Sequence, residues 1–306
     1  MTPAATFRLG IVTPVVTRLP GAHAQWEVDA GIAEIERCVV TAESLGYAFC
    51  TCSEHVAVPV DVAEVRGGTY WDPLAVFGYL AARTNRIQLA TFVLVLGYHH
   101  PLAIAKRYGT LDVVSNGRLI LGVGSGSLEE EFALLGAEFV NRGAVADDAM
   151  RALRASLSAA KPAYAGDHFA FTDFLVEPHA VQAHVPIWVG GRTARSLRRA
   201  VELGDGWAPF GLRTAELEAI LLRARRTEAW RTRETPLDVI LQNDRPWDPT
   251  AEPDRVSDQL GRMRSIGATG LAVRLVHHSL DHYCEQLEAL HQLVSADGAG
   301  RDDGGS

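Results

Sequence analysis

The stretch Ile187-Trp188-Val189-Gly190-Gly191-Arg192-Thr193, followed by residues 194–203, decides the fold of this chain. Residues 186–189 form an apolar run, which is typical of a parallel strand covered by helices on both faces. Gly190 and Gly191 let the backbone approach a ligand closely, and the Ala-, Leu- and Arg-rich residues that follow predict a helix. The first amides of this helix would face the loop, where a phosphate can bind. A plain strand-to-helix turn is the alternative interpretation.

Strand and helix signals alternate along the whole chain on both sides of this unit. The expected strands cover residues 7–13, 47–52, 87–96, 119–123, 186–189, 207–210, 237–241 and 271–276. Helical signals follow each strand, for example over 72–83, with Asp72 as N-cap and Pro73 at the first helical position. The pattern predicts an α/β fold, a closed (β/α)8 TIM-like barrel with insertions at the C-terminal ends of the strands. An open doubly wound sheet would carry Gly-x-Gly-x-x-Gly after its first strand, and residues 13–16 do not.

One domain accounts for the length and composition of the chain. With 306 residues and 47% apolar content, the chain can build one large core. We expect this domain to span residues 1–295. Residues 296–306 carry Gly, Asp, Ser and Ala without apolar periodicity, so we expect a disordered tail there. Insertions around 56–70, 141–174 and 211–253 are expected to wall a substrate pocket.

Charge and cysteine usage exclude several classes of protein. The net charge of −8 argues against a nucleic-acid partner and against an anionic membrane surface. No apolar run of about 18 residues predicts a membrane span, and the first residues lack a signal peptide. The four cysteines form no Cys-x-x-Cys pair and no zinc spacing, so we expect free thiols and no metal. A reducing, cytoplasmic location follows from this expectation.

Three further motifs follow expected strands, at the end where a barrel keeps its active site. Cys52-Ser53-Glu54-His55 follows the second strand, and the segment 91–101, with Phe92 and Val93, ends the third. Residues 121–126, with the sequence Leu-Gly-Val-Gly-Ser-Gly, end the fourth strand. Their alternating glycines clear space for a flat ring system, although a flexible turn explains them equally well.

These motifs occur together with Leu-Asp-x-x-Ser-Asn-Gly-Arg at 111–118, Glu-Phe-x-x-Leu-Gly at 131–136, Asn-Arg-Gly at 141–143 and Gly-Asp-Gly-Trp at 204–207. The ordered set, over residues 7 to 290, resembles the luciferase-like monooxygenase superfamily, and more narrowly its deazaflavin-dependent (coenzyme F420) oxidoreductases. The resemblance implies a homodimeric enzyme that transfers a hydride between coenzyme F420 and a small organic substrate. One alternative is an FMN-dependent monooxygenase supplied by a flavin reductase and using O2. The other is a non-catalytic flavin-binding protein.

The resemblance also implies the roles of particular residues. A bulge with a non-proline cis peptide near Phe92-Val93 would support the ring from behind. The loop Gly190 to Thr193 would hold the cofactor phosphate, with Arg192 as the anion clamp. The cofactor-binding set also contains Glu54, Ser125 and Gly126. His55 would transfer a proton near the ring, which suits a histidine at neutral pH.

Some positions depart from the pattern of the superfamily's sugar-phosphate dehydrogenases. Their glutamate after the fourth-strand glycines is Ser127 here, with glutamates displaced to 129–131, and their tryptophan is replaced by Pro59. Sugar-phosphate chemistry therefore does not carry over. A structural role for His55, such as a hydrogen bond to Glu54, is the alternative. Either histidine of the pair 99–100 could also reach the cofactor, and the substrate stays open.

Overall fold

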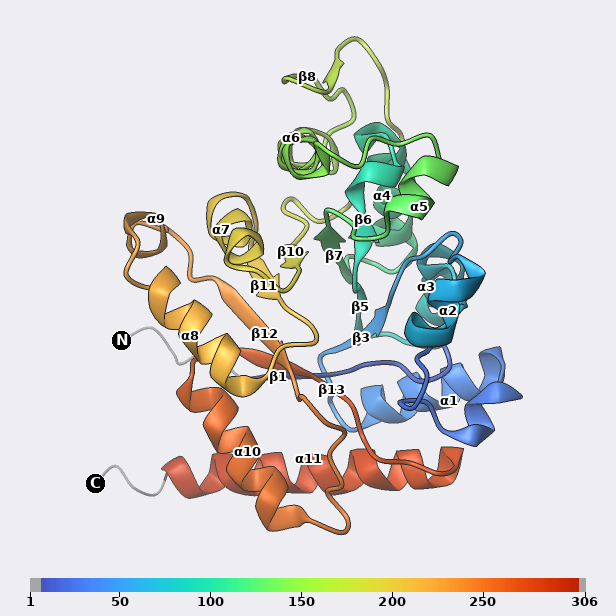
Figure 1. Ribbon diagram of the computed structural model, residues 1–306, viewed down its shortest axis with the longest axis vertical. Helices are drawn as coiled ribbons and strands as arrows, with labels where there is room; N and C mark the ends of the chain where they lie inside the picture. The colour runs from blue at the N-terminus through green and yellow to red at the C-terminus, as the bar shows by residue number, and fades with distance from the viewer. Residues whose placement is uncertain (1–6, 303–306) are drawn as a thin grey trace.

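The computed structural model describes residues 7–302 and forms a closed barrel (Figure 1). Its parallel strands are β1 (Arg8–Ile11), β3 (Phe49–Cys52), β5 (Gln88–Thr91), β7 (Leu119–Gly124), β10 (Ile187–Gly190), β11 (Gly206–Ala208), β12 (Asp238–Gln242) and β13 (Gly270–Val273). Each strand pairs with the next, and the ring closes because β10 pairs with β7 and β13 with β1. The predicted (β/α)8 barrel is confirmed.

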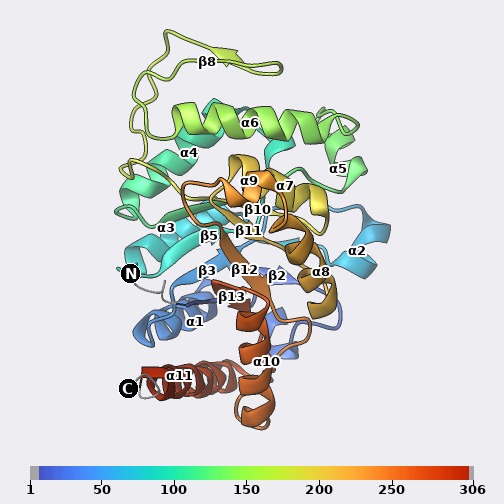
Figure 2. The ribbon, with the colours of Figure 1, turned by 90° about the vertical axis from the view of Figure 1, so that its left-hand side faces the viewer.

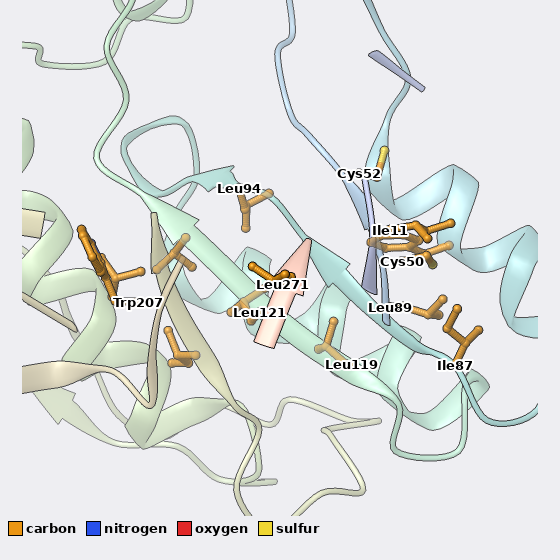
Figure 3. Close-up of a cluster of buried hydrophobic side chains, with 14 of the residues drawn as sticks. Ile11, Cys50, Cys52, Ile87, Leu89, Leu94, Leu119, Leu121, Trp207 and Leu271 are labelled. Carbon is orange, nitrogen blue, oxygen red and sulfur yellow. The ribbon is translucent and has the colours of Figure 1, made fainter. Parts of the chain in front are cut away.

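Side chains alternate between the inside of the barrel and its outer face along every strand. The interior is filled by a compact cluster made of Phe49, Ala90, Phe92, Ile120, Trp188, Ala208, Ile240 and Ala272. Their neighbours along the strands, such as Cys50, Leu89 and Leu119, point outward into a larger core (Figure 3). Because both faces of each strand are buried, the strands form continuous apolar runs in the sequence.

Helices surround the barrel on all sides (Figures 1 and 2). The longer ones are α1 (Ile32–Ser44), α3 (Pro73–Arg83), α4 (Pro101–Val114), α6 (Arg142–Ser156), α7 (Ala194–Leu203), α8 (Thr214–Ala224), α10 (Pro253–Ser265) and α11 (Leu280–Asp302). Short helices are η1 (Gln25–Val28), α2 (Val60–Arg66), η2 (Leu96–Tyr98), α5 (Glu129–Leu134) and α9 (Glu228–Arg231). Asp72 caps α3 as expected, since its side chain accepts a hydrogen bond of 2.9 Å from the Ala75 amide.

Short strands outside the barrel belong to the insertions. β2 (Thr17–Arg18) pairs antiparallel with β4 (Thr69–Tyr70), and β6 (Leu94–Val95) lies beside β7. β8 (Tyr164–Ala165) and β9 (Ala170–Phe171) form a hairpin that extends beyond α6 (Figure 2). Buried Asp148 of α6 anchors this hairpin, because it accepts hydrogen bonds from the Tyr164 hydroxyl and the His168 amide.

The last helix differs from the sequence-based expectation. α11 continues through residues 296–302, where the sequence predicted the start of a disordered tail. Backbone hydrogen bonds can extend an existing helix without any apolar periodicity. Residues 303–306 lie outside the described residues. No helix within 7–302 is both long enough and apolar enough to cross a membrane.

Candidate functional site

A backbone bulge follows β5 at the C-terminal rim of the barrel. The peptide bond between Phe92 and Val93 is cis, so the geometry expected at this point is confirmed. The end of β3 holds the bulge with three hydrogen bonds. The Phe92 amide donates to the Cys52 carbonyl at 2.7 Å, the Ser53 hydroxyl donates to the Phe92 carbonyl at 2.9 Å, and the Glu54 amide donates to the Val93 carbonyl at 3.3 Å.

Glycines on two neighbouring strands make room for the Val93 side chain. A Cβ atom at Gly124 of β7 would lie 2.7 Å from Val93 Cγ2, and one at Gly190 of β10 would lie 2.5 Å from Val93 Cγ1. Real Cβ contacts of this length do not occur without displacement. Half-buried Val93 therefore brings together the ends of β5, β7 and β10, with β3 beside them.

Glu54 lies behind the bulge. Glu54 is buried, and its Oε2 accepts a 2.7 Å hydrogen bond from the Val95 amide. Its Oε1 lies 2.6 Å from His99 Nε2. With both oxygens engaged, Glu54 holds the chain after the bulge in position. His100 takes a different role, because it is exposed and its ring accepts from the Leu102 amide at the start of α4.

His55 forms a hydrogen bond with a carboxylate other than its sequence neighbour. Its Nδ1 lies 2.7 Å from Glu131 Oε2, which also accepts from the Tyr98 hydroxyl at 2.7 Å. Glu131 Oε1 accepts from the amides of Val56 at 2.6 Å and Ala57 at 3.1 Å. Glu131 is only 1% exposed. One buried carboxylate on α5 therefore fixes the histidine and the loop after β3.

The surroundings of Glu131 determine where the protons of this cluster lie. Burial alone would raise its pKa, but the hydrogen bonds from His55, Tyr98 and the Ala57 amide outweigh burial, so the pKa is lowered. Burial and the same carboxylate raise the pKa of Tyr98. An ionised carboxylate only accepts hydrogen bonds, so His55 Nδ1 carries a proton. The atom left to take or give a proton is Nε2, and the ring of Tyr70 packs edge-on beside the imidazole at 4.5 Å.

Glu131→Gln should lower the free energy of unfolding at neutral pH, with a loss that shrinks in acid. A carboxylate whose pKa is depressed on folding stabilises the protein above its unfolded value, about 4.5. That contribution disappears as the pH falls through the folded value, and the glutamine variant never has it. Urea unfolding of both proteins from pH 7 to pH 3 measures the difference. A constant difference over this range would contradict the assignment of an ionised, stabilising Glu131.

The loop after β10 has the features expected of an anion site. Gly191 has φ = 127°, and a Cβ atom there would lie 2.8 Å from Ser196 Cβ. Thr193 caps α7 by accepting a hydrogen bond from the Ser196 amide at 3.3 Å. Arg192 is exposed, with its guanidinium 5.9 Å from the centroid of the Phe210 ring. Within residues 7–302 no carboxylate pairs with Arg192.

The arginines of α7 do not all share one solvated face. Arg195 and Arg198 are exposed. Arg199 is buried and forms an ion pair with Asp147 of α6, and it also donates to the Gly143 carbonyl at 3.0 Å. Arg199 therefore differs from its neighbours on the helix, because this position packs against α6.

Ser125 and Gly126 follow β7 on the same rim, directly after the strand that touches Val93. Gly126 has φ = 78°, and its carbonyl accepts from the Arg142 guanidinium at 3.2 Å. A Cβ atom at Gly126 would lie 2.4 Å from the Phe132 ring. This turn therefore needs glycine for packing and for conformation. Ser125 is half-buried beside it.

Sequence reasoning missed Glu131 and Tyr98 as partners in the His55 cluster, whereas His99, considered as a possible cofactor contact, bonds to Glu54. A signal existed for Glu131, which begins the motif at 131–136. Its role depends on α5 folding back over 76 residues of sequence separation to reach His55, and no spacing rule reveals such a contact. Among the described residues, no group of three His, Cys, Asp or Glu side chains could hold a metal ion. All four cysteines are free and buried.

The chain belongs to the luciferase-like monooxygenase family, whose model matches residues 7–270. It is an oxidoreductase of this family. The F420-dependent glucose-6-phosphate dehydrogenase of Amycolatopsis mediterranei is 29% identical over 181 residues, which cover 58% of this chain and 53% of that protein.

Two solved structures share the fold. Monooxygenase RslO1 from Streptomyces bottropensis has a TM-score of 0.76 and 19% identity, and the match covers 95% of this chain and 99% of that one. The coenzyme F420-dependent tetrahydromethanopterin reductase from Methanopyrus kandleri has a TM-score of 0.74 and 16% identity, covering 96% and 99%. At such identities the likeness shows the fold alone.

Proposed function

We propose that this protein is a coenzyme F420-dependent oxidoreductase that transfers a hydride between the deazaflavin and a small organic substrate. The observation that carries the proposal is the Phe92–Val93 bulge, whose Val93 side chain lies against the glycines of β7 and β10 and whose backbone bonds to Glu54, the residue before His55. The relationship to an F420-dependent dehydrogenase supports the deazaflavin over FMN.

The residues present fit a flat, phosphate-bearing cofactor. Half-buried Val93 offers an apolar surface at the rim, where a ring can stack. The turn of Ser125 and Gly126 borders this surface. The positive end of α7, behind Gly191 and Thr193, suits a phosphate together with Arg192, which pairs with no carboxylate in the part of the chain that the structure describes. When bound, the deazaflavin supplies the hydride chemistry, and the protein orients it and limits water.

His55 would move the proton that accompanies hydride transfer. Glu131 holds Nδ1–H, so Nε2 takes a proton from a substrate hydroxyl or gives one to a substrate carbonyl. Tyr98 and the amides of Val56 and Ala57 keep Glu131 in place. In this proposal Glu54 and His99 are positioning residues, because they support the backbone behind the bulge.

Titration with coenzyme F420 and with FMN, followed by ligand fluorescence, tests the cofactor. Binding of F420 alone, followed by turnover in a substrate screen, supports the proposal. Binding of FMN alone favours the second candidate, a monooxygenase that uses O2 and depends on a flavin reductase. The titration includes FMN because this chain shares its fold with monooxygenase RslO1. Binding without turnover of any substrate favours a flavin-binding protein. A cytoplasmic homodimer remains part of the proposal, and sedimentation of the purified protein tests its oligomeric state.

Arg192→Gln should weaken F420 binding about tenfold, because it removes a charge-assisted contact to the phosphate. The loss should be larger at low ionic strength, since salt screens exposed charges. Fluorescence titrations at two salt concentrations measure both effects. Arg195→Gln is the matched control, because Arg195 is also exposed and lies three residues further along, in the first turn of α7. Equal losses in the two variants would contradict a specific clamp at Arg192.

A further inference from the structure

A small pocket with polar and apolar walls lies at the ends of β1 and β13, and β1 pairs with β3, the strand that leads to His55. It has a volume of about 60 Å³, and its wall contains Val12, Thr13, Pro14, Thr17, Glu27, Arg274, His277 and Tyr283. Val12 also packs against the interior cluster of the barrel. The pocket therefore lies at the same end of the barrel as the candidate site, beside the strand that precedes His55.

Hydrogen-bonding groups without partners gather in this pocket. Thr17 Oγ1, the Tyr283 hydroxyl and Arg274 Nε are all buried without a hydrogen-bond partner within the described part of the chain. Tyr283 is 1% exposed, so bulk water does not compensate its hydroxyl. A buried polar group without a partner loses its hydrogen bonds to water and gains none in return, which is unfavourable. Three such groups around one cavity indicate a binding site for something that pairs with them.

His277 adds a donor whose direction is fixed. The indole N–H of Trp26 can only donate, and it lies 3.0 Å from His277 Nδ1. Neutral His277 therefore carries its proton on Nε2, and burial favours this neutral form by lowering the pKa of the ring. His277 Nε2 is 3.7 Å from Glu27 Oε1, which is too long for a hydrogen bond. The Nε2–H group stays available to a ligand.

The pocket supplies mostly donors, and its charges nearly balance. Glu27 already accepts hydrogen bonds from the amides of Val15 at 2.8 Å and Ala24 at 2.7 Å. Its negative charge opposes the positive charge of Arg274, whose guanidinium also donates to the Asp244 carbonyl. The Glu27 carboxylate would repel an anionic ligand, whereas a neutral oxygen acceptor avoids this repulsion and can still accept from the N–H and O–H groups of the wall. The chemistry therefore favours a neutral carbonyl oxygen over a carboxylate.

We propose that this pocket binds a neutral carbonyl group of the substrate through Thr17, Arg274 and Tyr283. Its volume holds only a small group, since a single water already needs about 10–15 Å³ of such space. Arg274 also lines a second cavity of about 160 Å³ at the ends of β11 and β12, with Phe210, Leu212 and Gln242 among its walls. That cavity receives the remainder of the molecule. That the ligand is the substrate rests on the proposed function, whereas its binding to the pocket needs no cofactor.

The test is a titration of the cofactor-free protein with cyclopentanone and with cyclopentanecarboxylate. The readout is the indole ¹⁵N–¹H resonance of Trp26, which Trp26→Phe assigns and which lies beside the pocket through His277. Cyclopentanone should shift this resonance saturably with a Kd of about 1–10 mM. The carboxylate should not. No shift with the ketone, as for a pocket that holds only water, would overturn the proposal, and so would a preference for the carboxylate.

Thr17→Val tests the pocket without changing its size, and should weaken cyclopentanone binding about fivefold, the equivalent of one neutral hydrogen bond. Arg274→Lys, which keeps the charge but not the Nε–H donor, should weaken it as well. Thr172→Val is the matched control, because Thr172 is exposed just after the hairpin strand β9. An unchanged Kd in both pocket variants would overturn the assignment. Because F420 is absent from this experiment, a failure of cyclopentanone to bind would not bear on the coenzyme titration. A failure of F420 to bind would likewise not bear on the pocket.

Discussion

Replacing His55 by asparagine should leave F420 binding unchanged and lower kcat at least about a hundredfold, the usual contribution of a positioned acid or base. The asparagine amide can occupy the place of Nδ1 and keep the hydrogen bond to Glu131, which is 2.7 Å long in the native protein. It has no group at the position of Nε2. The variant thus removes the proton-transferring atom while it preserves the local structure.

Steady-state kinetics with the substrate found in the screen, together with coenzyme fluorescence, measures the two quantities separately. A loss confined to kcat identifies a group that acts in the reaction, whereas a rise in KM alone identifies a binding contact. His100→Asn is the matched control, since His100 is exposed and asparagine is also a good N-cap for α4. An undiminished kcat in His55→Asn would show that another group moves the proton.

Gly122→Ala should destabilise the barrel by about 3 kcal/mol, at the upper end of overpacking effects. A Cβ atom at Gly122 would lie 1.8 Å from the Thr91 carbonyl oxygen. Because this oxygen belongs to the backbone, it cannot move away as a flexible side chain could. The Thr91 hydroxyl also donates to the Gly122 carbonyl at 2.7 Å, so the two strands are locked at this point. The methyl group would push β5 away from β7 just before the bulge.

Urea unfolding midpoints of wild type and variant measure this loss. Gly261→Ala is the matched control, because Gly261 lies within α10 and a Cβ atom there meets nothing within 4 Å. That change should stabilise the protein by about 0.5–1 kcal/mol, since alanine is the better helix former. Equal midpoints for Gly122→Ala and wild type would mean that β5 and β7 separate more easily than their contacts indicate.

The barrel could be predicted from the sequence because local signals mark each strand and helix, and their alternation along the chain defines the fold. Apolar runs mark strands buried on both faces, and residues such as Asp72 mark helix starts. The bulge was predictable only through resemblance, since nothing in Phe92-Val93 by itself favours a cis peptide. Helix α2 was missed, because none of its residues is buried and it lacks the apolar face that marks most helices.

The candidate site could be predicted only in part, for a related reason. Rim positions follow from strand ends, so Gly190, Gly191 and Thr193 were found with the strand itself. The partner of His55 depends on how an insertion folds, and the nearest carboxylate in sequence, Glu54, turns the other way toward Val95 and His99. Long-range contacts of this kind are set by tertiary packing, which residue spacing does not encode.

If His55 moves the proton as proposed, its hydrogen bond to α5 lets the activity be lost while the barrel stays intact. Glu131 lies on a helix of six residues that Phe132 fastens between Tyr98 and Phe139. Short segments of this size open with much less free energy than a whole domain needs. Each local opening would release the imidazole from its carboxylate. Thermal inactivation should then precede the melting of the barrel, and the working temperature of the enzyme would be set by one small helix.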